Sequence, residues 1–306
     1  MQFRLISLRY VLVAIAIGII GALLYTGSVY EKDFLQDYLL ARAVIDGTDP
    51  YIGLSTLAAP YADQAVRDRL GPLPTPHPPT VALLVLPLAY LPYHMAAIAW
   101  LAIELACLAV TIAILLPARW YAIVILAWLP ILADLESGQL MIPLLLILSS
   151  MYVAMRSGHH VLGGVILGLS FFLKPIAWPL LLVFMIKCRP AATFASVYVA
   201  LIGYSIAALV FSPETLFDYL TRALPMVTSY YLIDQTYTNY SLWKLGVPAV
   251  AAAFVLGLAV TVRSKSIHAP VAAMTLVAIL ISPIVWSYYF VLTLLPLAIT
   301  LRSSSD

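Results

Sequence analysis

The chain has 306 residues, of which 63% are hydrophobic and 10% are charged, with a formal net charge of +2. Soluble domains carry about 25% charged residues, so this composition excludes an ordinary soluble fold, and it indicates no nucleic-acid partner. Two cysteines and five scattered histidines show no spacing typical of a disulfide framework or a metal site. We therefore expect an all-α integral membrane protein without a metal or a cofactor.

Apolar runs of membrane-spanning character recur along the whole chain. The first, residues 10–26, follows a short basic segment. A cleaved signal peptide has the same organisation, but no small-x-small cleavage site follows, so we favour an uncleaved first span. The later runs are residues 94–116, 119–134, 139–155, 160–173, 175–187, 191–212, 247–262, 269–284 and 286–302. Together they predict about ten transmembrane helices in a single domain, residues 1–306.

Charged residues predict the orientation of these spans. The short connections carry the basic residues Arg4, Arg9, Arg119, Arg156, Lys187, Arg189, Arg263, Lys265 and Arg302. Placing them in the cytoplasm satisfies the positive-inside rule. Seven of the 14 acidic residues then fall in one outer loop, residues 27–78. The rule does not use acidic residues, so this separation supports the assignment independently.

Residues 80–92 are apolar but short, and Pro87 and Pro92 interrupt them. Counting them as a full crossing would reverse every later loop and place most basic residues outside. The segment is therefore predicted to be a re-entrant or broken helix that opens from the outer face. Such a backbone is tolerated at membrane depth only against protein or a wet cavity.

Two predicted outer loops, residues 27–78 and 213–246, are too long to be simple connections. The first contains DFLQDYLLARAVIDG, whose apolar positions fit an amphipathic helix that stops at Gly47. We expect this helix to lie along the membrane surface.

Four charged residues of that helix form two pairs with a spacing of four. Asp33 and Asp37 share a face, so one could act as a general base that the other tunes; a solvated helix face is the alternative. Arg42 and Asp46 have the same spacing, which favours a simple surface ion pair.

Three short motifs each place one polar side chain beside an apolar run. His77 in LPTPHPPTVALL could donate to a phosphate or a hydroxyl, or cap the broken helix at the interface. Gln139 in DLESGQLM could line a cavity or bond across helices. Lys174 in FFLKPIAW suits a lipid phosphate, although a lysine that snorkels to the interface gives the same pattern.

The second outer loop is rich in aromatic and polar side chains, including Arg222, Tyr230, Tyr231, Asn239, Tyr240, Trp243 and Lys244. Aromatic faces stack on the C–H patches of a sugar while amides bond its hydroxyls, but an interfacial aromatic belt has the same composition. The last outer turn, ISPIVWSYYFV, adds Trp286, Tyr288 and Tyr289. The predicted topology places all these segments on one side of the membrane.

The order of these motifs, DF-x3-Y-x2-A-x5-G-x2-PY, HPP, GQ, LKP, N-x-S and SPIxW, resembles glycosyltransferase family 87 from about residue 33 to about residue 300. That family contains polyprenyl-phosphate-mannose-dependent α-mannosyltransferases of the GT-C membrane class. The resemblance implies a GT-C fold whose two outer loops form an active-site cavity, on the extracytoplasmic face of a bacterial plasma membrane.

Carried over to matching positions, the resemblance makes Asp33 the catalytic base. It also implicates as cavity-lining residues Tyr38, Tyr51, His77, Gln139, Lys174 and Asn239. We add as candidate substrate-binding residues Asp37, Arg42 and Tyr288. Many relatives carry Asp-His after the Trp of the final motif, where this chain has Ser287 and Tyr288. A phenol cannot replace an imidazole that must be charged near neutral pH, so this position departs from the family.

The predicted partners are a polyprenyl-phosphate sugar as donor, a lipid or glycan as acceptor, and the surrounding membrane lipids. Two other functions stay open at this stage. Broken helices and buried charges also suit a transporter or flippase of lipid-linked sugars, although the sequence shows no internal repeat. The departure at Ser287 and Tyr288 is also compatible with a catalytically inactive relative.

Overall fold

The computed structural model describes residues 33–116, 129–188, 190–233 and 238–303. Within these ranges the secondary structure is entirely helical, with no β-strand. The predicted first span, residues 10–26, lies outside the described residues, as does most of the predicted span at 119–134.

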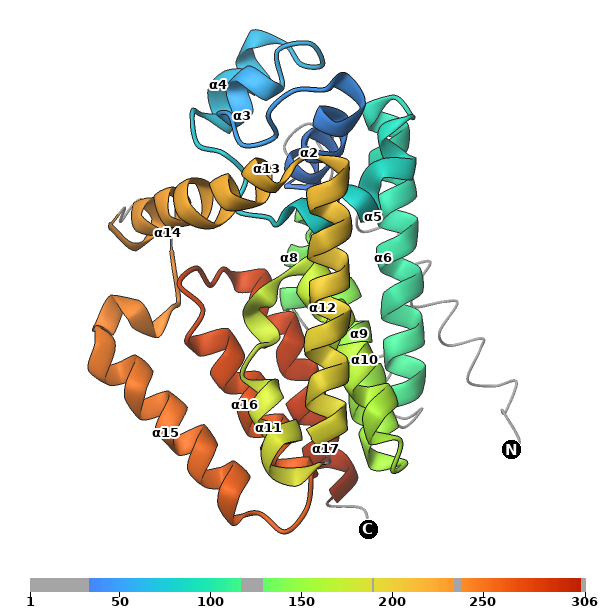
Figure 1. Ribbon diagram of the computed structural model, residues 1–306, viewed down its shortest axis with the longest axis vertical. Helices are drawn as coiled ribbons and strands as arrows, with labels where there is room; N and C mark the ends of the chain where they lie inside the picture. The colour runs from blue at the N-terminus through green and yellow to red at the C-terminus, as the bar shows by residue number, and fades with distance from the viewer. Residues whose placement is uncertain (1–32, 117–128, 189, 234–237, 304–306) are drawn as a thin grey trace.

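The first described elements gather at one end of the molecule (Figure 1). They are α2 (Phe34–Asp46), α3 (Leu54–Leu57), α4 (Gln64–Leu70) and α5 (Pro79–Ala89). α13 (Pro213–Asp218), a π-helical turn (Tyr219–Ala223) and α14 (Leu224–Ile233) cross the same end of the helix bundle.

Most remaining helices run roughly along the long axis of the molecule in Figure 1. α6 (Tyr93–Leu115) and α12 (Pro190–Val210) are the two described helices long and apolar enough to cross a membrane by length and composition. Shorter apolar helices are α9 (Met141–Arg156), α10 (His160–Leu173), α11 (Leu180–Lys187), α15 (Val247–Arg263), α16 (His268–Leu280) and α17 (Leu294–Ser303). The total of ten spans stays a prediction.

Several element bounds agree closely with the apolar runs of the sequence. The run at 160–173 forms α10 over the same residues, and the run at 247–262 forms α15. α8 (Leu129–Ser137) extends three residues beyond the predicted span end at 134, and the run at 286–302 begins as a 3-10 helix, Ser287–Thr293. Two further 3-10 turns are Pro175–Ala177 and Leu242–Leu245.

Helix α2 forms in the first predicted outer loop and is more deeply buried than its sequence indicates. It forms where expected and ends at Gly47, whose φ of 64° is the left-handed conformation that favours glycine. Eight of its 13 residues are buried by protein, including Asp37, and it packs against α5 and α6. Asp37 is therefore not on a solvated helix face, and the position of α2 along a membrane surface stays a prediction.

Helix α5 has 11 residues and therefore a length of about 16 Å. The hydrocarbon core of a bilayer is about 30 Å thick, so a straight α5 is too short to cross it. Its sequence contains Pro87, and it packs on α2. This agrees with the short, broken helix predicted at residues 80–92; its entry into the membrane stays a prediction.

Helices α10 and α12 approach each other closely at glycines. A Cβ atom added to Gly164 would clash with the backbone carbonyl of Ala192, and one added to Gly168 would lie 2.7 Å from the carbonyl oxygen of Ser196. Small residues allow this close backbone contact between helices. Because α10 ends immediately before Lys174, the contact also fixes the place of that lysine.

Gly164→Ala is expected to destabilise the protein by about 1–3 kcal/mol, the usual cost of overpacking a tight contact. The neighbouring Gly163→Ala is the matched control, since its Cβ would meet the flexible Met155 side chain at 3.0 Å. Thermal unfolding in detergent measures both variants. Equal melting temperatures for the two would contradict this description of the α10–α12 contact.

Candidate active site

A cavity of about 660 Å³ opens among the elements at the end of the molecule where α2 lies. Its size lies within the range typical of ligand pockets, about 300–1,000 Å³. Polar side chains that line it include Asp33, Gln36, His77, Gln139 and Lys174. Apolar lining comes from segments far away in the sequence, among them Ile176, Leu224, Val227, Ala278 and Ile281.

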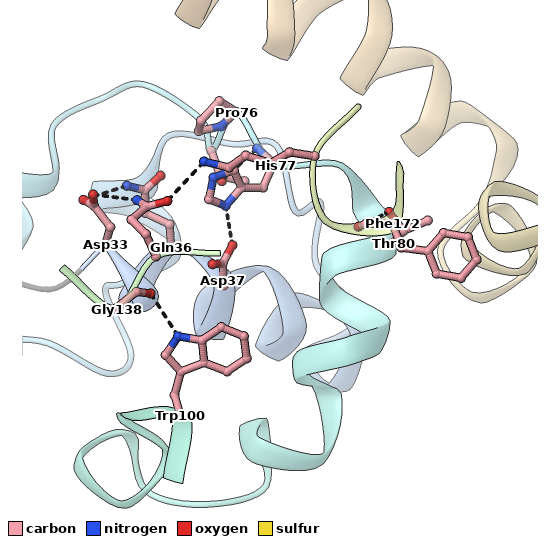
Figure 2. A network of polar contacts seen from close by, with 12 residues as sticks. Asp33, Gln36, Asp37, Pro76, His77, Thr80, Trp100, Gly138 and Phe172 are labelled. Carbon is pink, nitrogen blue, oxygen red and sulfur yellow. Dashed lines mark hydrogen bonds and ion pairs between the residues drawn. The ribbon is translucent and has the colours of Figure 1, made fainter. Parts of the chain in front are cut away.

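A chain of hydrogen bonds joins a carboxylate and an ammonium across this cavity. Gln139 Nε2 donates to Asp33 Oδ2 at 2.6 Å, and Lys174 Nζ donates to Gln139 Oε1 at 3.1 Å. Lys174 fixes the orientation of the amide, because an ammonium only donates and must face Oε1, which leaves Nε2 for Asp33. The other oxygen of Asp33, Oδ1, has one long contact, from Gln36 Nε2 at 3.4 Å (Figure 2).

The environment of Asp33 favours its protonated form more than water does. Burial raises the pKa of the Asp33 carboxyl above its usual range. The hydrogen bond from Gln139 and the positive charges of Lys174 and His77 lower the pKa and oppose this rise. A raised carboxyl pKa is a property of groups that accept protons during catalysis.

Local structure explains how Gln139 reaches Asp33. Gly138 has a φ of 66°, and its carbonyl accepts a hydrogen bond from Trp100 Nε1 at 3.1 Å (Figure 2). The ring of Trp100 stacks on Phe34, with centroids 5.1 Å apart. Phe34 follows Asp33 directly, so this contact brings the glycine–glutamine turn to the start of α2.

Lys174 is only 6% exposed, so the ammonium is not snorkelling into water. Its Nζ lies 3.4 Å from the hydroxyl of Tyr289 and 4.8 Å from the centroid of that ring. The ring of Tyr288 is 5.9 Å away and stacks on Tyr289. The two tyrosines after Trp286 therefore form an aromatic wall beside the buried cation, with the geometry of a cation–π contact.

The loop that carries His77 is held from several sides. Nδ1 of His77 lies 2.5 Å from Asp37 Oδ1 (Figure 2). The backbone N–H of His77 donates to Thr75 Oγ1 at 3.2 Å, and its carbonyl accepts from Tyr51 at 3.0 Å. Tyr219 donates to the preceding carbonyl, that of Pro76, at 3.4 Å. These contacts fix the imidazole at the cavity wall.

The structure brings together half of the ten residues selected from the sequence. Those that line the cavity are Asp33, His77, Gln139, Lys174 and Tyr288. The others lie outside its lining: Asp37, Tyr38, Arg42, Tyr51 and Asn239. Their roles in substrate binding stay predictions, but the contacts of each are clear.

Three of these outlying residues support the end of the fold that contains the cavity. The hydroxyl of Tyr38 donates to the carbonyl of Leu91 at 2.9 Å. Arg42 pairs with Asp46 at 2.7 Å, as the spacing predicted, and also donates to the carbonyl of Ala89 at 3.2 Å. Tyr51 holds the His77 loop, as described above.

Asn239 uses its whole amide to fasten the second of the two predicted outer loops. Its Nδ2 donates to the carbonyls of Pro283 at 2.9 Å and Tyr231 at 3.3 Å. Its Oδ1 accepts from the backbone N–H groups of Ser241 at 3.1 Å and Val285 at 2.9 Å. Asn239 thus joins the loop to the segment that precedes Trp286.

Sequence reasoning missed several polar lining residues, among them Gln36, Arg69 and Tyr219. Gln36 follows Asp33 by three residues, so helical spacing could have singled it out. Arg69 and Tyr219 belong to α4 and the π-helical turn, and no local pattern shows that these segments meet at the cavity. In the described part of the chain, no group of three or more His, Cys, Asp or Glu side chains could hold a metal ion.

The fold and the cavity define an all-helical protein with apolar helices and a charged site enclosed at one end of the bundle. Residues 76–301 match the family model for glycosyltransferase family 87. The chain therefore belongs to that family, which confirms the resemblance seen in its motifs, and it is a membrane glycosyltransferase. No curated protein and no solved structure matches the chain. The matched range begins after Asp33, so the assignment of that residue rests on its position and on the motif around it.

Asn239→Ala is expected to lower stability by about 1–3 kcal/mol, because it leaves partly buried backbone groups without partners. Tyr240→Phe is the matched control, since this neighbouring side chain is 49% exposed. Thermal unfolding measures the difference. If Asn239→Ala unfolds at the wild-type temperature and only weakens substrate binding, the fastening role is wrong.

Proposed function

We propose that the protein transfers a hexose, and by family resemblance mannose, from a polyprenyl-phosphate sugar to a lipid or glycan acceptor. The reaction takes place at the extracytoplasmic face of the membrane. The observation that carries the proposal is the chain Asp33–Gln139–Lys174, which sets a base and a cation one amide apart within one cavity.

Asp33 acts as the general base. An acceptor hydroxyl donates its proton to Oδ1, the carboxylate oxygen that has only a long contact in the structure. The hydroxyl oxygen forms a bond to the anomeric carbon from the face opposite the phosphate. The bond between that carbon and the phosphate oxygen breaks, and the phosphate leaves with the electron pair. One displacement inverts the anomeric configuration.

Lys174 stabilises the charge that develops on the departing phosphate. A buried cation is effective in this role because the cavity walls exclude water, which strengthens the electrostatic interaction. Gln139 prevents Asp33 and Lys174 from collapsing into a direct ion pair, since its amide lies between them. The base thus remains available to the acceptor hydroxyl, and the cation remains available to the departing phosphate.

The apolar lining supports a lipid-linked donor. Ile176, Val227, Ala278 and Ile281 line the same cavity as the charged residues. Contact between such an apolar surface and a hydrocarbon chain removes both from water and lowers the free energy of the complex. A polyprenyl-phosphate sugar has both parts, since its phosphate and sugar need the polar groups and its chain needs the apolar ones.

Asp33→Asn is expected to reduce transfer by at least 10²–10⁴-fold, the usual contribution of positioned proton transfer. Asp46→Asn, the same change at the exposed far end of α2, serves as the control. The assay incubates purified protein with a radiolabelled polyprenyl-phosphate sugar and a crude lipid extract, and melting temperatures confirm that the variants fold.

New glycolipid from the wild type but not from Asp33→Asn supports the proposal. Near-wild-type transfer by Asp33→Asn would remove Asp33 from the mechanism. Movement of the donor across a vesicle without any product would instead support a transporter, and neither product nor movement would support an inactive relative.

The pH profile tests the base separately. Asp33 must be deprotonated to act, and its pKa is raised, so kcat/KM should be lost as the pH falls through a value above the ordinary aspartate pKa of about 3.9. Lys174→Met removes a charge that lowers this pKa, and it should move the acid limb to higher pH. An acid limb at an unchanged pH in this variant would contradict the electrostatic coupling of the two residues.

A further inference from the structure

Asp37 and His77 form a buried pair that the mechanism above does not use. The two residues are 1% and 3% exposed, and Nδ1 of the imidazole lies 2.5 Å from Oδ1 of the carboxyl. The second oxygen of Asp37, Oδ2, is enclosed and makes no hydrogen bond to the described residues. The pair thus depends on this one contact.

The other ring nitrogen of His77 has a different environment. His77 lines the cavity. Its Nε2 is not sealed off without a partner, as Oδ2 of Asp37 is. Since Nδ1 is occupied by Asp37, Nε2 is the atom through which the imidazole meets a ligand. Its protonation decides whether the ligand must offer an acceptor or a donor.

Two charge states of the pair are possible in principle. If the pair carries a net negative charge, the proton lies on Nδ1 and Nε2 is a bare acceptor, as in a catalytic base. If the pair is neutral overall, whether as an ion pair or as an acid beside a neutral ring, Nε2 carries a proton. Burial strongly penalises the first state, because Asp37 would hold an uncompensated charge with one oxygen unbonded.

Neighbouring charges also favour the state in which the Asp37–His77 pair is neutral overall. Asp33, one helical turn before Asp37, already supplies a negative charge to this wall, and Lys174 compensates it through Gln139. Thr75, Tyr51 and Tyr219, which contact the His77 loop, add hydroxyl groups without formal charge. Arg69 is a further cation that lines the cavity, but among the described residues the printed ion pair of Asp37 is with His77.

We propose that Asp37 is a positioning residue that keeps Nε2 of His77 protonated and directed into the cavity, where it donates a hydrogen bond to a phosphate oxygen of the lipid-linked donor. The inference rests on the proposed function for the identity of that ligand. Asp37 itself does not touch the substrate, and its contribution passes through the imidazole. His77 is thus a phosphate donor group and not a second base.

The test measures binding without transfer. The probe is a short-chain polyprenyl monophosphate, compared with the polyprenol of the same length, in detergent-solubilised wild type, Asp37→Asn and His77→Gln. Asp37→Asn removes the negative charge beside Nδ1, so a doubly protonated imidazole loses the carboxylate that compensates its charge. Asp46→Asn, on the same helix but exposed, is the control.

At about pH 8, Asp37→Asn is expected to bind the monophosphate about tenfold more weakly than wild type, as the loss of a charge-assisted hydrogen bond implies. At about pH 5.5, where acid supplies the proton that the carboxylate no longer holds, the ratio to wild type should return to near one. Because each ratio is taken at one pH, the titration of the probe cancels. His77→Gln should alter phosphate affinity without this pH recovery, and Asp46→Asn should match wild type at both values.

A wild-type affinity in Asp37→Asn at about pH 8 would overturn the proposal. An equal loss at both pH values would also overturn it, because a purely structural defect does not reverse on protonation. If Asp37→Asn fails to fold, ¹⁵N-histidine spectra of the wild type decide: the signal absent from His77→Gln must show a protonated Nε2 at about pH 8. If the wild type transfers no sugar, the proposed function is refuted, but the phosphate-binding result still holds.

Discussion

The hydrogen-bonded chain Asp33–Gln139–Lys174 is the interaction on which the account of this protein depends. It joins the start of α2, the turn before α9 and the end of α10. All three lie at helix termini, where the backbone is released from the regular hydrogen-bond pattern and side chains can point into a shared space. A buried charge is costly unless it is paired, so each end of this chain stabilises the other.

The same chain explains how one cavity can serve two chemical tasks. A direct ion pair would neutralise the base and the cation together, whereas an intervening amide keeps them apart while satisfying both. The packing around it is close: Phe34 and Trp100 stack beside the Gly138 turn, and α10, which ends at Lys174, meets α12 at its glycines. The apolar wall then adds a surface that can contact a hydrocarbon chain. A soluble sugar-nucleotide donor would not need such a surface.

The sequence predicts the helices well because lipid-facing runs are long and apolar, and α10 and α15 lie almost where their runs lie. Its motifs also identify Gln139 and Lys174, since isolated polar groups in such runs are costly and stand out. Spacing alone could not place Asp37. The spacing puts the carboxylate on a helix face. It does not reveal the contact with His77, 40 positions later, and that contact lies in the protein interior.

Long-range contacts also decide the remaining differences. The composition of the second outer loop suggested a sugar-binding Asn239, yet its amide is used by four backbone groups, two of them from the segment before Trp286. Tyr219 lines the cavity from a π-helical turn, and such turns have no apolar periodicity by which to find them.

The most direct test of a single displacement with Asp33 as its base is the stereochemistry of the product. Purified protein is given a polyprenyl-phosphate hexose of defined anomeric configuration, and the linkage in the new glycolipid is determined by NMR. The account predicts complete inversion, with release of the polyprenyl phosphate. Retention of configuration would require a covalent intermediate or a second nucleophile, and it would contradict the assignment of Asp33 as the base of a one-step transfer.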